Sequence, residues 1–200
     1  MPLIWLLAII LVLAAAGFVM GRSRAVASAG GDARVLHSLP SYYGWNVALT
    51  VITPAFGLLV LWLLEQPLWI ENRVSADLPE AAIANDTTRS LVMSDVRRVA
   101  DCLQVLVDTG TMSEEEVVDM RTEFTNVRER LGEVGVALGS SVEPAVMTAA
   151  QSYRVLSNRG SLLMAVGVVL VALGGFAVSY IVTNKDFRAR NAVERGILLV

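Results

Sequence analysis

Three long apolar runs dominate the pattern of hydrophobic and polar positions along this chain. They cover residues 1–20, 44–64 and 161–183, and none of them contains a charged side chain. A helix rises about 1.5 Å per residue and the hydrocarbon core of a bilayer is about 30 Å thick, so each run is long enough to span it. Lipid offers no partner to backbone polar groups, which predicts helices. The pattern therefore predicts an all-α integral membrane protein with three transmembrane helices.

The second and third runs contain residues that shape helix packing. Pro54 lies in the middle of the second run, where its missing N–H predicts a kink that neighbouring helices or Thr50 and Thr53 would compensate. In the third run, Gly175 and Ser179 lie one turn apart, and two small side chains allow another helix to approach closely. The alternative is that this pair occurs by chance on a lipid-facing helix.

The first run has an alternative interpretation as a cleaved signal peptide, because residues 27–29 (ASA) resemble a small-residue cleavage site. A secretory signal carries positive charge before its apolar run. Here no basic residue precedes the run, whereas Arg22, Arg24 and Arg34 follow it. The charge pattern favours a retained helix.

Positive charge in the short connections predicts the orientation. The connection at residues 21–43 contains three Arg and one Asp, and the segment at 184–195 contains four basic and two acidic residues. Both are expected to be cytoplasmic. The N-terminus and residues 65–160 are then expected outside. His37, in the first connection, is interpreted as an interfacial polar residue rather than a ligand.

The water-exposed segment at residues 65–160 has helical patterns and no alternating strand pattern. In its first part, apolar residues recur at steps of three and four up to a stop at Gly110: Val92, Val96, Val99, Leu103 and Leu106. Ser113 and Glu116 have the spacing of a capping box. A second pattern follows over residues 117–138, which predicts an antiparallel helical hairpin with the first.

A third pattern completes the predicted bundle outside the membrane. It contains Val142, Val146, Ala149, Tyr153 and Leu156, with Pro144 in its first turn. Asn158 and Gly160 are expected to separate this helix from the third membrane helix.

Composition and charge limit the chemistry of the chain. Its 200 residues are 54% hydrophobic and 18% charged, with a net charge of −3, one Cys and one His. The charge argues against nucleic acid as a partner. A single Cys and a single His exclude a disulfide, a Cys-based zinc site or a His-based triad within the chain. No phosphate loop, dinucleotide turn or nucleophile elbow occurs. We therefore predict no catalytic, cofactor-binding or metal-binding residue and no enzymatic activity.

Several polar residues have a simpler interpretation than a functional site. Glu114, Glu115 and Glu116 resemble a metal cluster but stand in the first turn of a predicted helix, where negative charge is favoured. Arg97 and Asp101 have the i, i+4 spacing of a solvated ion pair. Cys102 is expected to be a partly buried small hydrophobe. Residues 85–87 (NDT) match a glycosylation sequon, a pattern that is common by chance.

The last five residues, 196–200, are apolar and follow the basic segment directly. Five residues cannot cross a bilayer. They are interpreted as the start of a truncated fourth transmembrane helix, so that the chain would be the front part of a longer membrane protein.

Several short phrases resemble the N-terminal region of the PstC family, the permease subunits of bacterial phosphate ABC transporters, in their long form. They are LHSLPSYYG at residues 36–44, IENRV at 70–74 and RNAVERG at 190–196, in that order after the N-terminal apolar helix. The resemblance implies a bacterial inner-membrane permease component for phosphate import. It also implies three partners: a second permease subunit, a cytoplasmic ATPase and a periplasmic phosphate-binding protein. No functional residue is carried over, because the permease core follows this region in that family.

Two other functions remain open from the residues alone. Two membrane helices that bracket an outer helical bundle are typical of a sensory receptor, although a signalling coiled coil would be expected where residues 196–200 are apolar. A membrane scaffold or assembly protein is the other alternative.

Overall fold

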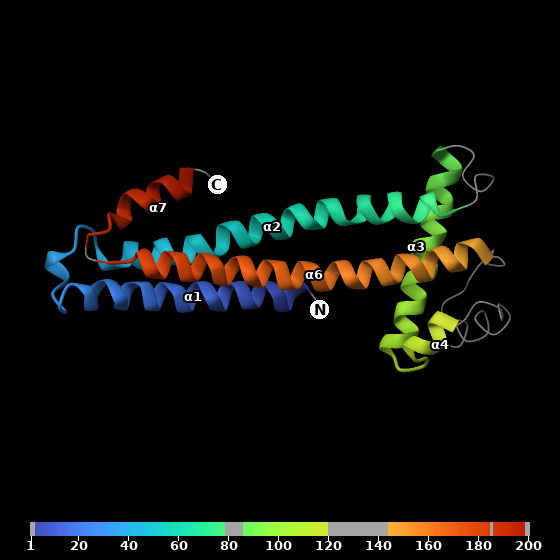
Figure 1. Ribbon diagram of the computed structural model, residues 1–200, viewed down its shortest axis with the longest axis horizontal. Coiled ribbons are helices and arrows are strands. Elements are labelled where there is room, and N and C mark those ends of the chain that lie inside the picture. Colours follow the sequence, from blue (N-terminus) through green and yellow to red (C-terminus); the bar gives the residue numbers. More distant parts are fainter. Residues whose placement is uncertain (1–2, 79–85, 120–143, 185, 199–200) are drawn as a thin grey trace. The chain divides into compact units, whose positions relative to one another are not determined.

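The structure, a computed structural model, describes residues 3–78, 86–119, 144–184 and 186–198. In these ranges the chain forms helices and turns without a strand, as the all-α prediction requires (Figure 1). The helices are α1 (Leu3–Ser28), η1 (Ala33–Val35), α2 (Pro40–Ala76), α3 (Asp86–Asp108), α4 (Glu114–Asp119), α6 (Pro144–Val182) and α7 (Ala189–Leu198). The chain divides into two compact units, one formed by Met1–Leu63 with Ser161–Val200 and the other by Leu64–Gly160.

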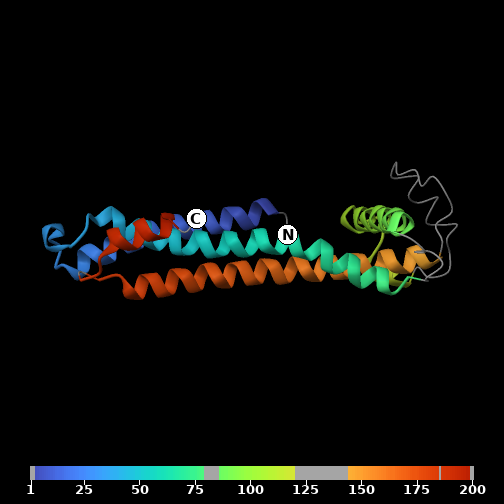
Figure 2. The same cartoon turned by 90° about the horizontal axis from the view of Figure 1, so that it is seen from above.

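The first unit, here called the membrane unit, is built on three long apolar helices. Each of α1, α2 and α6 is long and apolar enough to cross a membrane, which agrees with the three predicted spans. They lie side by side in this unit (Figure 2). Buried side chains join them in one core that includes Leu6, Ile10, Val51, Leu59 and Val168.

The outward faces of the same helices are also apolar. Large hydrophobic side chains such as Trp5, Leu11, Leu170 and Ile181 are exposed on them. A helix that is apolar on all sides needs an apolar environment outside the protein. The membrane unit is therefore built to face lipid.

The helices are longer than the apolar runs from which they were predicted. Helix α1 continues to Ser28, and α2 begins at Pro40, so the connection expected at residues 21–43 is helical at both ends. The extension is stabilised because Ala25 and Tyr43 are buried in a small core with Ala189. Burial of these residues keeps the chain helical beyond the last apolar residue of each run.

Asn158 and Gly160 do not interrupt the chain, so the expected separation of the third outer helix from the third membrane helix is wrong. Helix α6 is continuous from Pro144 to Val182. The Gln66 side chain packs on Gly160 and donates a hydrogen bond from Nε2 to the Ser157 carbonyl (3.3 Å). Glycine costs a helix about 1 kcal/mol relative to Ala, and this contact offsets the cost by occupying the space that a side chain would take.

The second unit, here called the outer unit after the side of the membrane predicted for it, has its own core. The residues of the first and third helical patterns meet there, with Val96, Leu103, Leu106, Met147 and Ala150 among those buried. Val117 of α4 is buried in the same core. Residues 120–143, which include most of the second pattern, lie outside the described residues, so the predicted hairpin stays a prediction.

Both predicted helix boundaries around Gly110 are confirmed. Gly110 has a φ of 71°, and the Thr111 and Gly110 amides donate to the Leu106 and Val107 carbonyls, the pattern of a Schellman motif. The Glu116 amide donates to Ser113 Oγ (3.2 Å), and the Ser113 amide donates to Glu116 Oε2 (2.8 Å). This reciprocal pair is the predicted capping box.

Two expected polar interactions differ from the structure. Arg97 pairs with Glu71 of α2 (2.5 Å) rather than with Asp101, because α2 and α3 pack together in the outer unit. Glu114 pairs with Arg154 of α6 in addition to standing in the first turn of α4. Cys102 is buried, as predicted.

Near the end of the described chain, the last helix begins at an earlier residue than expected. Helix α7 begins at Ala189, within the segment expected to be a cytoplasmic connection, and continues to Leu198. Ala189 and Val193 face the protein and Ile197 is exposed. A fourth spanning helix at residues 196–200 stays a prediction.

Candidate functional site

A buried hydrogen bond joins α2 and α6 inside the membrane unit. Asn46 Nδ2 donates to Ser179 Oγ over 2.7 Å, and both residues are less than one-tenth exposed. In an apolar environment, a carboxamide without a partner is costly, so such a bond holds two helices in one register. Ser179 is one of the two small residues that the sequence singled out.

Next to this bond, a freed backbone carbonyl faces Gly175. Pro54 has no N–H, so the Thr50 carbonyl lacks its helical donor. The Thr50 hydroxyl donates to the Asn46 and Val47 carbonyls (both 2.9 Å), one turn earlier. A Cβ on Gly175 would clash with the Thr50 carbonyl oxygen, so only glycine allows this approach. The close contact expected from Gly175 and Ser179 is thus confirmed.

Helix α1 approaches α2 as closely, through glycines that the sequence analysis missed. A Cβ on Gly21 would lie 2.6 Å from Val47 Cγ2 and 2.9 Å from the Tyr43 carbonyl oxygen. A Cβ on Gly44 would lie 2.7 Å from the Phe18 carbonyl oxygen. The available signal was the G-x-x-x-G spacing of Gly17 and Gly21, which is typical of helix pairs in membranes.

The two connecting segments of the membrane unit are joined at one end, here called the loop end. Arg24 donates from Nε to the Thr183 carbonyl (3.2 Å), just past α6, and its guanidinium lies 4.3 Å from the centre of the Tyr180 ring. A positive charge near the last carbonyls of a helix is stabilising, because these groups form the negative end of the helix dipole. The Tyr43 hydroxyl donates to the Phe187 carbonyl (2.8 Å). These contacts fix the start of α7 against α1 and α2.

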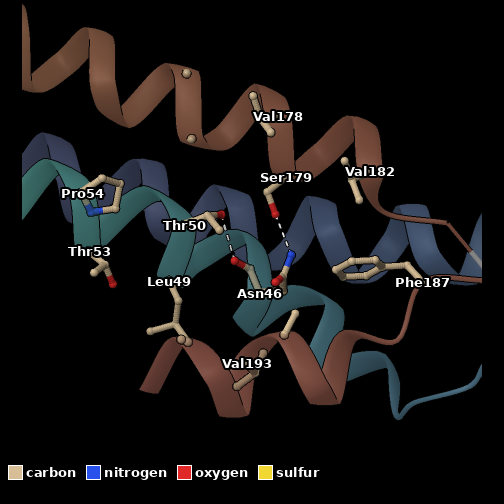
Figure 3. Close-up of a pocket in the computed structure, with 14 residues that line it drawn as sticks. Asn46, Leu49, Thr50, Thr53, Pro54, Val178, Ser179, Val182, Phe187 and Val193 are labelled. Carbon is tan, nitrogen blue, oxygen red and sulfur yellow. Dashed lines mark hydrogen bonds between the residues drawn. The ribbon is translucent and has the colours of Figure 1, made fainter. Parts of the chain in front are cut away.

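A cavity of about 590 Å³ lies between α2, α6 and α7 (Figure 3). Its walls are mainly apolar, with Leu49, Val178 and Val193 among them. The polar side chains that line it are Asn46, Thr50, Thr53 and Ser179. None of the side chains that line it is titratable. The cavity can therefore receive an apolar group and offer it one polar contact, but it carries no group for proton transfer.

In the outer unit, a charged network surrounds Arg154. Its side chain is 4% exposed, donates from Nη1 to Gln104 Oε1 (3.1 Å) and pairs with Glu114. Asn158 donates to the same Gln104 oxygen (3.1 Å). A buried guanidinium needs such partners, since an unpaired charge is costly to desolvate. The network connects α3, α4 and α6, and the sequence did not identify Arg154 as its centre.

No group of three or more His, Cys, Asp or Glu side chains that could hold a metal ion occurs among the residues that the structure describes. The sequon at residues 85–87 begins outside the described residues. The candidate site of this chain is therefore the contact region of α2, α6 and α7 in the membrane unit.

Comparison with known proteins identifies the family of this chain. No curated protein and no solved structure matches the chain. A family model described as "Phosphate ATP-binding cassette transporter" matches residues 7–177. This range includes all of α2, most of α1 and most of α6, with Asn46, Thr50 and Gly175 inside it and Ser179 just beyond it. The chain is a membrane protein that belongs to the phosphate ATP-binding cassette transporter family.

Proposed function

We propose that this chain forms the N-terminal part of the permease for inorganic phosphate in a bacterial inner membrane. The observation that carries the proposal is the family match over residues 7–177. This range includes all of α2 and most of α1 and α6, the three apolar helices. The resemblance of residues 36–44, 70–74 and 190–196 to the PstC family supports the more specific assignment.

The role of the chain in this proposal is assembly and not chemistry. The buried Asn46–Ser179 bond and the Gly175–Thr50 contact hold the membrane helices at fixed spacing and register. A permease works by moving helices against one another, and such movement needs a part that stays constant. The membrane unit is this constant part, next to the phosphate path of the permease core.

The partners follow from the same assignment. A second permease subunit contacts the membrane helices, and a cytoplasmic ATPase works on the side of residues 184–195. The outer unit lies in the periplasm, where a phosphate-binding protein delivers the ion. This placement is supported by the arginine-rich connections at the loop end, since basic residues remain on the cytoplasmic side.

Phosphate uptake by whole cells tests the proposal. In a strain whose only high-affinity phosphate importer contains this chain, deletion of the chain should abolish uptake of radiolabelled phosphate at low external concentration. Gly175→Leu should do the same, because its side chain would collide with the α2 backbone.

The matched control is Gly57→Leu, since Gly57 has no atom within 4 Å of where its Cβ would be. Uptake in this variant should equal that of the wild type at the same expression level. Normal phosphate uptake in the deletion strain, with sulfate uptake as a reference, would refute the assignment.

A further inference from the structure

The cavity between α2, α6 and α7 is space that these helices leave open when they pack together. Two of its lining residues, Gly174 and Gly196, have open space where a side chain would be. Other glycines of the membrane unit, such as Gly21, Gly44 and Gly175, are instead filled by a neighbouring helix. Gly57 is open in the same way, so what distinguishes Gly174 and Gly196 is that both line the cavity.

The size of the cavity favours a thin occupant. The cavity measures about 590 Å³, within the range of roughly 300–1,000 Å³ that single small molecules occupy. One flexible hydrocarbon chain fits this space and these apolar walls.

The polar part of the cavity lies toward the loop end. Asn46 is in the second turn of α2, and Ser179 is in the last turn of α6. Pro54 lines the cavity further along α2 (Figure 3), and Gly174 lines it just over one turn before Ser179 on α6. Asn46 uses Nδ2 for Ser179, and its carboxamide oxygen takes no part in that bond. It can accept a hydrogen bond from an occupant whose polar group lies near the membrane surface.

The loop end is strongly basic. The described residues of 21–43 and 184–198 carry six arginines against three acidic residues: Arg22, Arg24, Arg34, Arg188, Arg190 and Arg195 against Asp32, Asp186 and Glu194. The contacts of Arg24 with Thr183 and of the Arg190 amide with Ser38 Oγ (3.3 Å) bring both segments to the same end. Such a cluster attracts anionic headgroups.

We propose that the cavity binds one acyl chain of an anionic phospholipid, with the glycerol end of the lipid beside Asn46 and its phosphate among the arginines of the loop end. The apolar chain fills the space at Gly174. The lipid then becomes part of the interface between α7 and the α2–α6 pair.

Lipid binding to the full chain in mild detergent tests the proposal, with phosphatidylglycerol as the probe and phosphatidylcholine of the same acyl chains as the reference. Native mass spectrometry counts the lipids bound per chain across a titration. Wild-type protein should bind one phosphatidylglycerol more tightly than further copies and more tightly than phosphatidylcholine.

Gly174→Leu should weaken this first binding step about tenfold, since its side chain takes the volume of roughly two methylene groups of the lipid. Gly57→Leu is the matched control, because it also adds a leucine to a helix in open space but lies outside the cavity. Val178→Phe is the second cavity variant, since Val178 is exposed and lines the cavity without belonging to the core.

Arg188→Gln tests the headgroup, with the exposed Arg98→Gln of the outer unit as its control. The loss of one basic contact should weaken phosphatidylglycerol binding about fivefold in Arg188→Gln only. Equal binding by wild type, Gly174→Leu and Val178→Phe would overturn the proposal, and so would an equal loss in Gly57→Leu.

Two other results would assign the cavity differently. Phosphatidylcholine that binds as tightly as phosphatidylglycerol would refute an anionic headgroup site. A dimer of the chain that is lost in Gly174→Leu and kept in Gly57→Leu would assign the cavity to a helix of a second copy. The readout is lipid binding and not transport, so a failure of the proposed phosphate uptake leaves this inference standing.

Discussion

At the scale of single residues, two adjacent glycines of α6 have opposite surroundings. Gly175 is pressed against the Thr50 carbonyl oxygen, whereas Gly174 has no atom within 4 Å of where its Cβ would be. The same substitution at the two positions therefore separates the effect of helix propensity from the effect of packing.

Gly175→Ala should destabilise the membrane unit by about 1–3 kcal/mol, because the added methyl group forces α6 away from α2. Gly174→Ala should leave stability unchanged or raise it by up to about 1 kcal/mol through better helix propensity. Unfolding of the full chain in mixed micelles with increasing SDS measures both free energies. Equal effects at the two positions would contradict the Thr50–Gly175 contact.

The thiol of Cys102 should be less acidic than that of an exposed cysteine. Burial in the outer unit raises its pKa, and the neighbouring Asp101 carboxylate raises it further, while Arg98 lowers it in part. A raised pKa means that the folded state prefers the neutral thiol. The resulting stabilisation is fully present below the pKa of the unfolded thiol and is lost as pH rises through the higher pKa of the folded state.

Alkylation by iodoacetamide, which reacts with the thiolate, checks this prediction. The rate for the native chain should still be rising at pH values above the ordinary thiol pKa of about 8.5, where the rate in SDS has levelled off. Cys102 is the chain's only cysteine, so the bulk rate reports this site. Superimposable pH profiles for native and SDS-treated protein would show that the thiol is not buried.

At the scale of elements, the local signals for helix ends agree with the structure because they act within one turn. Gly110 ends α3 through its positive φ, and Ser113 with Glu116 begins α4. The continuity of α6 is the counterexample. Asn158 and Gly160 read locally as a break, yet Gln66 of α2 fills the space beside Gly160. Tertiary packing from another helix overrides a weak local signal.

Ser113→Ala should loosen the start of α4 by about 1 kcal/mol, since the Glu116 amide loses its acceptor. Hydrogen exchange of the amides in residues 113–119 should then be about fivefold faster, with exchange in α6 unchanged. Ser113→Thr is the control, because its hydroxyl can replace the serine oxygen. Exchange rates in Ser113→Ala that equal those of the Thr variant would refute the capping role.

At the scale of the whole molecule, the prediction is topology. Residue 139, in the outer unit, and residue 185, after α6, should lie on opposite sides of the membrane, because α6 includes one apolar span between them. Alkaline phosphatase fused after Gly139 should be active, and the same fusion after Lys185 should be inactive. Green fluorescent protein at the two sites should give the inverse pattern. A cytoplasmic signal at Gly139 would show that the predicted orientation is wrong.

The sequence by itself determined the number of apolar helices, their class and several of their ends. These properties depend on the run of side chains along one helix and on bonds within a turn, so they can be read without neighbours. The tertiary structure decided which residues meet. Asn46 bonds to Ser179, and the Thr50 carbonyl contacts Gly175. Arg97 pairs with Glu71, and Arg154 pairs with Glu114. Each partner is far away in the sequence, and only the packing of whole helices brings the two together.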